Sequence, residues 1–174
     1  MCDRSDRHGT IGAVNANNPA VESLHLVLGD EELLMDRAVA QIVARVRAAA
    51  PGAEDLPVTK LRTGDASAPE LLELLSPSLF AEDRVVVLEA AAEAGKDAVA
   101  LVLDAASDPP EGAVLVIMHS GGGRAKAMVG ALQKAGAVTH ECAKLTKPAE
   151  RVDFVRREFS AAGVRVGGDV VEAV

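Results

Sequence analysis

The sequence predicts an α/β fold, with a five-stranded and mainly parallel sheet that carries helices on both faces. Apolar runs of strand length alternate five times with helical patterns, and the connections between them are short. Two of these runs, 85–88 and 113–118, are almost continuously apolar, which is typical of strands buried on both faces. Parallel neighbours require right-handed crossover connections, and the intervening helices supply them.

The first strand is expected at 24–28, where Gly29 ends a short apolar run. Asp30 then caps a helix whose apolar residues recur near a spacing of 3.6 residues as far as Ala50. A second strand is expected at 56–61.

A helix begins next, at Ser67 or Ala68, with Pro69 at its first position and four leucines within 71–75. Pro77 disfavours helical geometry in the residue before it, so this helix should end there. The remaining elements follow the same alternation: a strand at 85–88, a helix at 96–106, a strand at 113–118, a helix at 124–134 and a strand at 137–141.

The composition limits the class of protein. No apolar run approaches the ~20 residues that a membrane helix needs, and residues 1–23 lack an apolar secretory core, so we expect a cytoplasmic protein without membrane contact. The two cysteines, Cys2 and Cys142, are expected to be free thiols in a reducing compartment. The four histidines are scattered, without metal-ligand spacing, and are expected on the surface or at strand ends.

Three segments are expected along the chain. Residues 1–22 lack periodicity and predict a flexible leader, and 23–143 form the α/β domain. Residues 144–174 begin a helical second domain, with Pro148 near the start of its first helix. Asp169 starts another helix in which the chain stops, so we expect this chain to be the first part of a longer protein.

The net charge of −8 is unevenly distributed. Residues 119–158 carry eight basic and four acidic side chains, a net charge of +4, and the rest of the chain carries −12. An acidic body argues against nucleic-acid binding by this chain alone. The basic segment is either an ordinary solvated surface or a face turned to nucleic acid within a larger assembly.

No intact phosphate-binding loop is present. After the first strand, residues 29–34 lack the second glycine and the lysine of a P-loop, and they place three carboxylates where phosphate would bind. The glycine-rich, basic loop at 121–126 precedes a helix, and it is either a surface loop or a phosphate loop of unusual spacing. No residue pattern for covalent or acid–base catalysis is legible, and no cofactor or metal is predicted.

An apolar pair, Leu79-Phe80, stands between the leucine-rich helix and the strand at 85–88. On a helical turn, consecutive residues point about 100° apart, so packing both under one sheet is awkward directly after Pro77. The pair is therefore either part of the core or an exposed anchor for a partner's pocket.

The order of these motifs resembles one family, the delta subunit of bacterial DNA polymerase III, which belongs to the sliding-clamp loader. Residues 26–34 match a strand, a glycine, an acidic residue and a leucine pair, and 78–80 match a Ser-Leu-Phe that precedes an apolar strand at 85–88. The strand at 114–118 and the helix over 147–159 continue the similarity.

The resemblance implies an AAA+-type fold that has lost its ATP site. It also implies that Leu79 and Phe80 insert into a hydrophobic pocket of the beta sliding clamp and help to open that ring. Contacts at the rim must supply the rest of the affinity, and Ser76, Ser78 and Glu82 are the candidates for them. Pro77 stands where better-known members have a methionine, and it would stiffen the loop.

The same resemblance implies the partners. Other clamp-loader subunits would assemble mainly through a C-terminal domain beyond this chain, and DNA would be met only within the assembled complex, where Arg124 and Lys126 are candidates to face it. We therefore predict a non-catalytic, clamp-binding loader subunit. The rivals are a nucleotide-binding α/β enzyme that uses the loop at 121–126 and an α/β scaffold with Leu79 and Phe80 buried.

Overall fold

The computed structural model describes residues 21–49, 56–77, 83–144, 146–161 and 163–164. Its sheet has five strands in the order β2-β3-β4-β1-β5, and every neighbouring pair is parallel. The predicted fold class is confirmed. The strands are β1 (Leu24–Leu28), β2 (Val58–Arg62), β3 (Arg84–Glu89), β4 (Ala113–His119) and β5 (Val138–Glu141).

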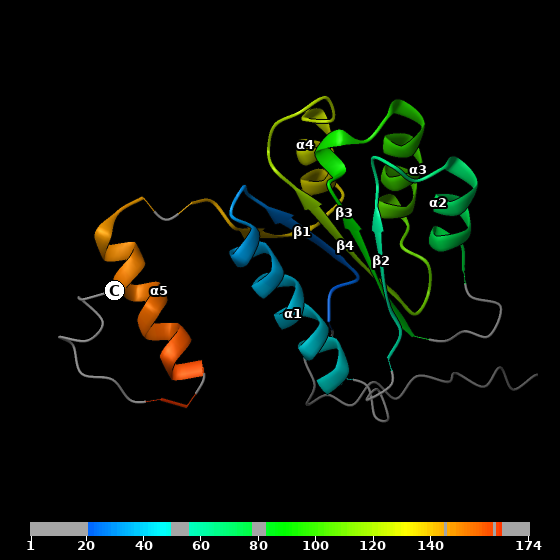
Figure 1. The fold of residues 1–174 in the computed structure, drawn as a ribbon. Coiled ribbons are helices and arrows are strands. Elements are labelled where there is room, and N and C mark those ends of the chain that lie inside the picture. Colours follow the sequence, from blue (N-terminus) through cyan, green and yellow to red (C-terminus); the bar gives the residue numbers. More distant parts are fainter. Residues whose placement is uncertain (1–20, 50–55, 78–82, 145, 162, 165–174) are drawn as a thin grey trace, which may run out of the picture.

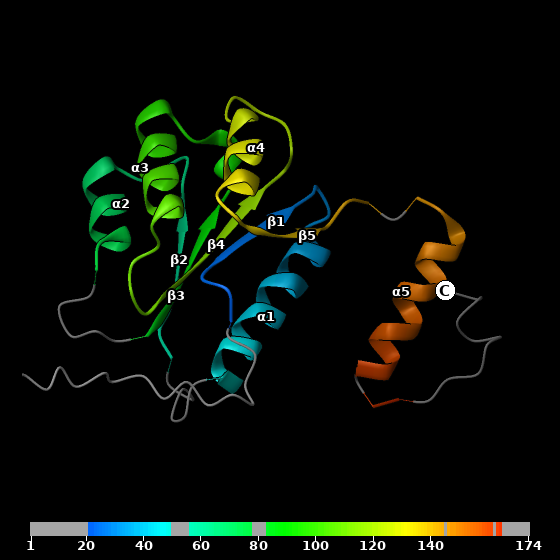
Figure 2. The ribbon, with the colours of Figure 1, turned by 180° about the vertical axis from the view of Figure 1, so that it is seen from behind.

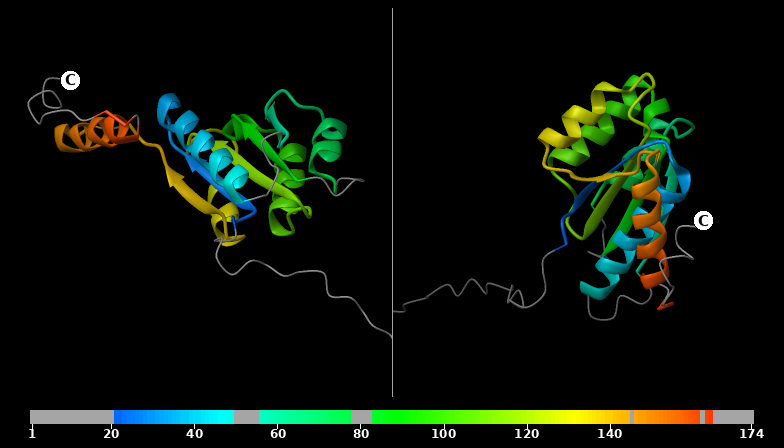
Figure 3. Two further views of the ribbon diagram at one scale, coloured as in Figure 1. Left: turned by 90° about the horizontal axis from the view of Figure 1, so that it is seen from below. Right: turned by 90° about the vertical axis from the view of Figure 1, so that its left-hand side faces the viewer.

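Helices cover both faces of the sheet, as predicted (Figure 1, and from behind in Figure 2). One face carries α1, and the other carries α2, α3 and α4, while α5 lies beyond α1 on the outside of the domain (Figure 3). Arg37 on α1 pairs with Glu158 on α5. The helices are α1 (Glu32–Ala49), α2 (Ala68–Leu75), α3 (Lys96–Ser107), α4 (Ala127–Lys134) and α5 (Pro148–Ala161), with a short 3-10 helix, η2 (Ala91–Glu93).

The sheet separates two hydrophobic cores. Successive side chains of a strand point to opposite faces, so Val85 and Val87 of β3 pack with α1, whereas Val86 and Leu88 pack with α2, α3 and α4. All four are fully buried. Burial on both faces explains the continuous apolar run that marks this strand in the sequence. In the described part of the chain, no helix is both long and apolar enough to cross a membrane.

Two element starts differ from the sequence prediction by two residues or more, and one short helix was not predicted. β2 begins at Val58 rather than Leu56, because Pro57 has no N–H to donate and offers only its carbonyl oxygen to the Val85 N–H, at 2.9 Å. Helix α4 begins at Ala127 rather than Arg124. The helix η2, directly after β3, was not predicted.

The expectation that the histidines lie on the surface or at strand ends is wrong for His25. This residue is fully buried within β1, and its Nδ1 lies 3.2 Å from Nε2 of His140 on the adjacent β5. His119 ends β4, as expected of a strand-end residue, and is also fully buried. Its Nδ1 accepts the Gly121 N–H at 2.8 Å, and its Nε2 lies 3.2 Å from the Ala125 carbonyl oxygen, which favours the Nε2–H tautomer.

Burial disfavours the charged form of these imidazoles and lowers the pKa of His25, His119 and His140. For His25 the neighbouring His140 lowers the pKa further, because two imidazolium charges at this separation repel each other. The folded chain therefore holds these side chains neutral at pH values where the unfolded chain binds protons.

We expect the stability of the chain to fall as the pH drops below about 6.5, the ordinary pKa of histidine. Because the folded pKa values lie lower, the unfolded chain takes up protons first, and the free energy of unfolding should be largest above pH 6.5 and decline toward pH 5. Urea unfolding at several pH values measures this slope. His25→Gln should flatten it, since glutamine does not titrate, and stability that rises on acidification would contradict the expectation.

Candidate functional site

The parallel sheet divides the candidate functional residues between two opposite edges. The strands start at one edge, where the connections α2–β3 and α3–β4 lie, and they end at the other. The predicted anchor belongs to the α2–β3 connection at the amino edge. Both candidate phosphate positions, the turn at Gly29 and the loop at 121–126, lie at the carboxyl edge, where ligands bind in open α/β sheets.

The predicted anchor falls largely outside the described residues. Ser78, Leu79 and Phe80 belong to the segment that the structure does not describe, and their predicted exposure stays a prediction. Pro77, the last described residue before them, is exposed at the surface. The structure describes the two ends of this connection, up to Pro77 and from Asp83 onward.

Helix α2, which leads into the connection, has a well-defined start. The Ser67 hydroxyl accepts the backbone N–H of Glu70 at 3.4 Å, and the Glu70 carboxylate accepts the backbone N–H of Ser67 at 2.9 Å. This reciprocal pair is a capping box. The hydrogen bonds from Ser67 lower the pKa of Glu70. Ser67 rather than Ala68 is thus the cap, which decides between the two residues that the sequence left open.

The end of α2 is held from the far side of the connection. Arg84, the first residue of β3, donates from Nη2 to the Ser76 carbonyl oxygen and, at 3.4 Å, to the Leu74 carbonyl oxygen. Carbonyl groups in the last turn of a helix lack partners within the helix and attract cations. A single guanidinium therefore fastens the residue before Pro77 to the start of β3, so both ends of the predicted anchor segment are fixed to the core.

Backbone groups fill the position where a P-loop would hold phosphate. The Gly29 N–H donates to the His119 carbonyl at 3.0 Å, and the Glu31 N–H donates to the Cys142 carbonyl at 3.2 Å. A Cβ atom on Gly29 would lie only 2.1 Å from that Cys142 oxygen. Phosphate binding at a helix start needs free N–H groups. Here the end of β4 occupies the Gly29 N–H, and the residue after β5 occupies the Glu31 N–H.

The glycine-rich loop at 121–126 is docked on η2 instead of forming an open cradle. The Ala125 N–H donates to the Ala92 carbonyl oxygen at 3.2 Å. Gly123 has a φ of +72°, and a Cβ atom there would lie 2.5 Å from the same oxygen, so the close approach requires glycine. The Gly121 N–H donates to His119 Nδ1 and the Ala125 N–H to the Ala92 carbonyl, so these two N–H groups of the loop are occupied.

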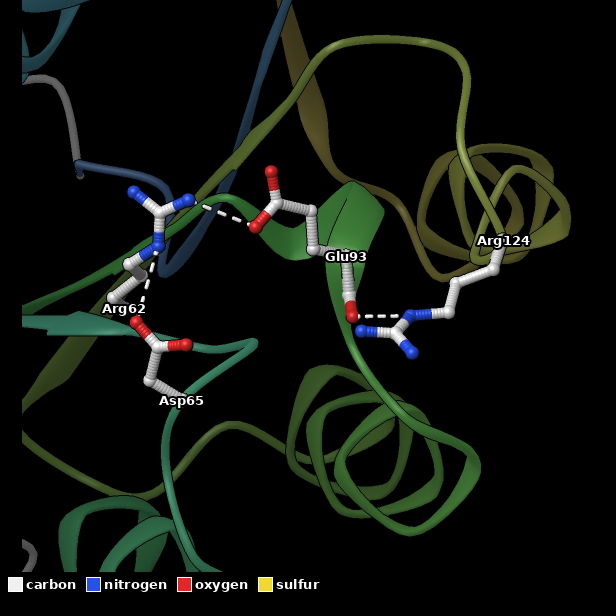
Figure 4. A network of polar contacts seen from close by, with 4 residues as sticks. All are labelled: Arg62, Asp65, Glu93 and Arg124. Atoms are coloured by element: carbon white, nitrogen blue, oxygen red, sulfur yellow. Dashed lines mark hydrogen bonds and ion pairs between the residues drawn. The ribbon is translucent and has the colours of Figure 1, made fainter.

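Arg124, one of the two predicted DNA-facing residues, takes part in a polar network at the carboxyl edge (Figure 4). Its Nε donates to the Glu93 backbone carbonyl at 2.5 Å. Arg62 donates from Nη2 to the Glu93 carboxylate at 2.8 Å, which raises the pKa of Arg62, and its Nε lies 3.2 Å from Asp65. Lys126, the second candidate, is exposed at the start of α4.

Sequence reasoning missed the roles of Arg84, Arg62 and Glu93. An arginine at the start of an apolar strand was one available signal, because a charge there must point toward a partner. The network has no sequence signal, since Arg62 and Glu93 are 31 residues apart. Cys142 was expected to be a free thiol and is one. Its burial, which was not predicted, raises the pKa of the thiol. Among the described residues, no three His, Cys, Asp or Glu side chains gather as a metal site.

Comparisons with known proteins agree with this architecture. A family model for the DNA polymerase III delta subunit matches residues 25–142. No curated protein matches in direct sequence comparison. Among solved structures, the Bacillus subtilis DNA clamp loader delta protein is similar with a TM-score of 0.61 at 17% identity, covering 88% of this chain and 47% of that one.

The Thermotoga maritima RuvB Holliday junction branch migration motor is also similar, with a TM-score of 0.53 at 15% identity, over 86% of this chain and 47% of that one. The chain thus spans about half the length of both structures. At these identities the likeness shows the fold alone, which this chain shares with both structures.

Replacement of Arg84 by alanine should destabilise the chain by about 1–3 kcal/mol, because the α2 carbonyls lose a charged, partly buried donor. Arg45→Ala is the matched control: Arg45 pairs with Glu22 at 3.7 Å with both side chains about half exposed, and its loss should cost about 1 kcal/mol or less. Urea unfolding measures both, and equal losses would refute the tethering role of Arg84.

Gly29→Ala should destabilise the chain by about 1–3 kcal/mol, because the added methyl group meets the Cys142 carbonyl. Gly130→Ala in α4 is the control, since a Cβ atom there has no neighbour within 4 Å, and alanine should stabilise this helix by up to about 1 kcal/mol. The two variants should therefore shift the urea midpoint in opposite directions. A Gly29→Ala variant as stable as wild type would show that the turn is open.

Proposed function

Because the chain belongs to the DNA polymerase III delta-subunit family, we propose that it is a non-catalytic clamp-loader subunit that binds the beta sliding clamp through Leu79 and Phe80 and helps to open the ring. The observation that carries this proposal is the family match over 25–142, which contains the whole α2–β3 connection. Binding energy, and not ATP hydrolysis by this chain, drives the opening.

The fixed ends of the connection support a role as an anchor. Arg84 ties the last carbonyls of α2 to β3, and Pro77 restricts its own backbone. A restrained loop loses less conformational entropy when it is ordered on a partner. Fully burying a leucine or phenylalanine contributes roughly 1.5–3 kcal/mol each, and a micromolar complex needs about −8 kcal/mol. Two anchors supply much of this, and rim residues such as Ser78 supply the rest.

The carboxyl edge of the sheet supports a non-catalytic role. The Gly29 turn is filled by the Cys142 carbonyl, and Asp30, Glu31 and Glu32 place three carboxylates beside it. A triphosphate there would meet both steric and electrostatic opposition. In the loop at 121–126, two N–H groups are already occupied. No observation favours the nucleotide-dependent enzyme over the loader subunit.

The assembly follows the family. In this proposal, residues 144–174 begin the helical lid domain, of which α5 is the first helix, and a region beyond this chain joins the other loader subunits in the cytoplasm. Arg124 and Lys126, both exposed at the carboxyl edge, face DNA only in the assembled loader. The Arg124 side chain is already held by the Glu93 carbonyl, which orients it before any DNA binds.

Leu79→Ala/Phe80→Ala should weaken binding to the cognate beta clamp by about 100-fold or more, the equivalent of two lost anchors. Surface plasmon resonance with immobilised clamp measures the affinity, and circular dichroism with urea unfolding measures the fold. Leu33→Ala is the matched control, because Leu33 is also a large apolar side chain, 56% exposed, but lies on α1.

Three outcomes decide the proposal. Binding lost with the fold intact supports the anchor, provided that Leu33→Ala binds like wild type. An unfolded double variant places the pair in the core, which is the scaffold reading. If the wild-type chain does not bind the clamp but binds ATP, the nucleotide-binding enzyme is the better explanation.

A further inference from the structure

A groove of about 570 Å³ opens between α2 and α3 at the amino edge of the sheet, immediately beside Pro77. The apolar residues that line it include Leu72 and Leu75 of α2 and Leu101 of α3. Figure 1 shows the two helices side by side, with both C-terminal ends near the start of the α2–β3 connection. Pro77, which lines the groove, is the last described residue before the segment proposed to carry the clamp anchor.

Leu72 marks the groove as a surface that lacks a partner within this chain. Leu71 and Leu75 already provide the buried face of α2, whereas Leu72 is 57% exposed. It lines the groove without contributing to either hydrophobic core. A large apolar side chain that borders a groove and remains half exposed is typical of a protein-binding surface.

Three carboxylates, Asp104, Asp108 and Glu111, form an acidic rim along the α3 side of the groove. All three residues are exposed, and within the described residues none pairs with a cationic side chain. Asp104 lies in the last turn of α3 and Asp108 caps its C-terminus. The helix dipole disfavours negative charge there, so these acids do not serve the stability of α3.

We infer that this groove is a second part of the clamp interface and that it receives an apolar side chain of the beta clamp flanked by lysine or arginine. The leucines that line the groove provide the apolar contact, and the acidic rim selects the basic flank. The inference rests on the proposed function: Pro77 lines the groove, and Leu79 follows it by two residues, which at about 3.5 Å per residue brings a partner of Leu79 and Phe80 within reach of the groove. It adds an electrostatic component to an anchor that is itself uncharged.

The test uses Asp104→Lys/Asp108→Lys in the 174-residue chain, with binding to the cognate clamp measured at 0.1 M and 1 M salt. We expect at least a tenfold loss of affinity at 0.1 M, and a much smaller loss at 1 M, because salt screens charges more strongly at the higher concentration. The urea midpoint should stay the same or rise, since lysine suits a helix C-terminus. A purely structural role would lower it.

Asp36→Lys/Glu141→Lys is the matched control. It changes the net charge equally, with two exposed acids on α1 and β5, away from the groove. This variant should bind the clamp within about twofold of wild type, whereas Leu72→Ala, which removes the apolar side chain beside the groove, should weaken binding about tenfold while the fold stays intact.

The outcomes separate this inference from the proposed function. If Leu79→Ala/Phe80→Ala abolishes clamp binding while the rim variant and Leu72→Ala bind like wild type, the anchor stands and the groove is refuted. If the rim variant and the charge control lose affinity equally, net charge is responsible and the groove is refuted. If the wild-type chain does not bind the clamp, the proposed function and the groove inference are both refuted. If the rim variant instead alters self-association, seen by light scattering, a second copy of the chain occupies the groove.

Discussion

Burial of the central strands on both faces is the constraint on which this structure depends. β3, β4 and β1 have fully buried side chains toward both sides, so each face of the sheet must be covered by helices. Parallel strands with right-handed crossovers meet this requirement, with α1 on one face and α2, α3 and α4 on the other. The same arrangement sends every strand start to one edge and every strand end to the other.

The two edges differ in how closely they are packed. At the carboxyl edge, the Cys142 carbonyl and the Gly29 turn approach so closely that a methyl group has no room, and the Glu93 network fastens the adjoining loops. At the amino edge, α2 borders an open groove, and the exposed Pro77 follows two residues after the end of the helix. The closed edge is held by contacts within the chain, whereas the groove edge leaves apolar and acidic side chains available to a partner.

Arg84 connects the sheet to the proposed binding edge. Because one guanidinium holds carbonyls at the end of α2, a force on the α2–β3 connection is transmitted to β3, which is buried on both faces. A connection restrained in this way loses less conformational entropy when it is ordered on a partner. Helix capping at Ser67 stiffens the other end of α2 in the same way.

Local patterns in the sequence determined much of the fold. The runs of apolar residues predicted both ends of β1 correctly, and the ends of β3 and β4 to within one residue. A strand that is buried on both faces needs apolar residues at successive positions, and this pattern is visible in the local sequence. The start of α2 was also predictable, because the residues that cap it, Ser67, Pro69 and Glu70, are neighbours in the sequence. A resemblance in motif order indicated the family, which the match over 25–142 shows.

Tertiary structure alone decided the strand order, the pairing of His25 with His140 at a separation of 115 residues, and the closure of the Gly29 turn by Cys142. These features depend on contacts between segments that are far apart in the sequence, and the spacing of residues within one segment does not specify which distant segment it will contact.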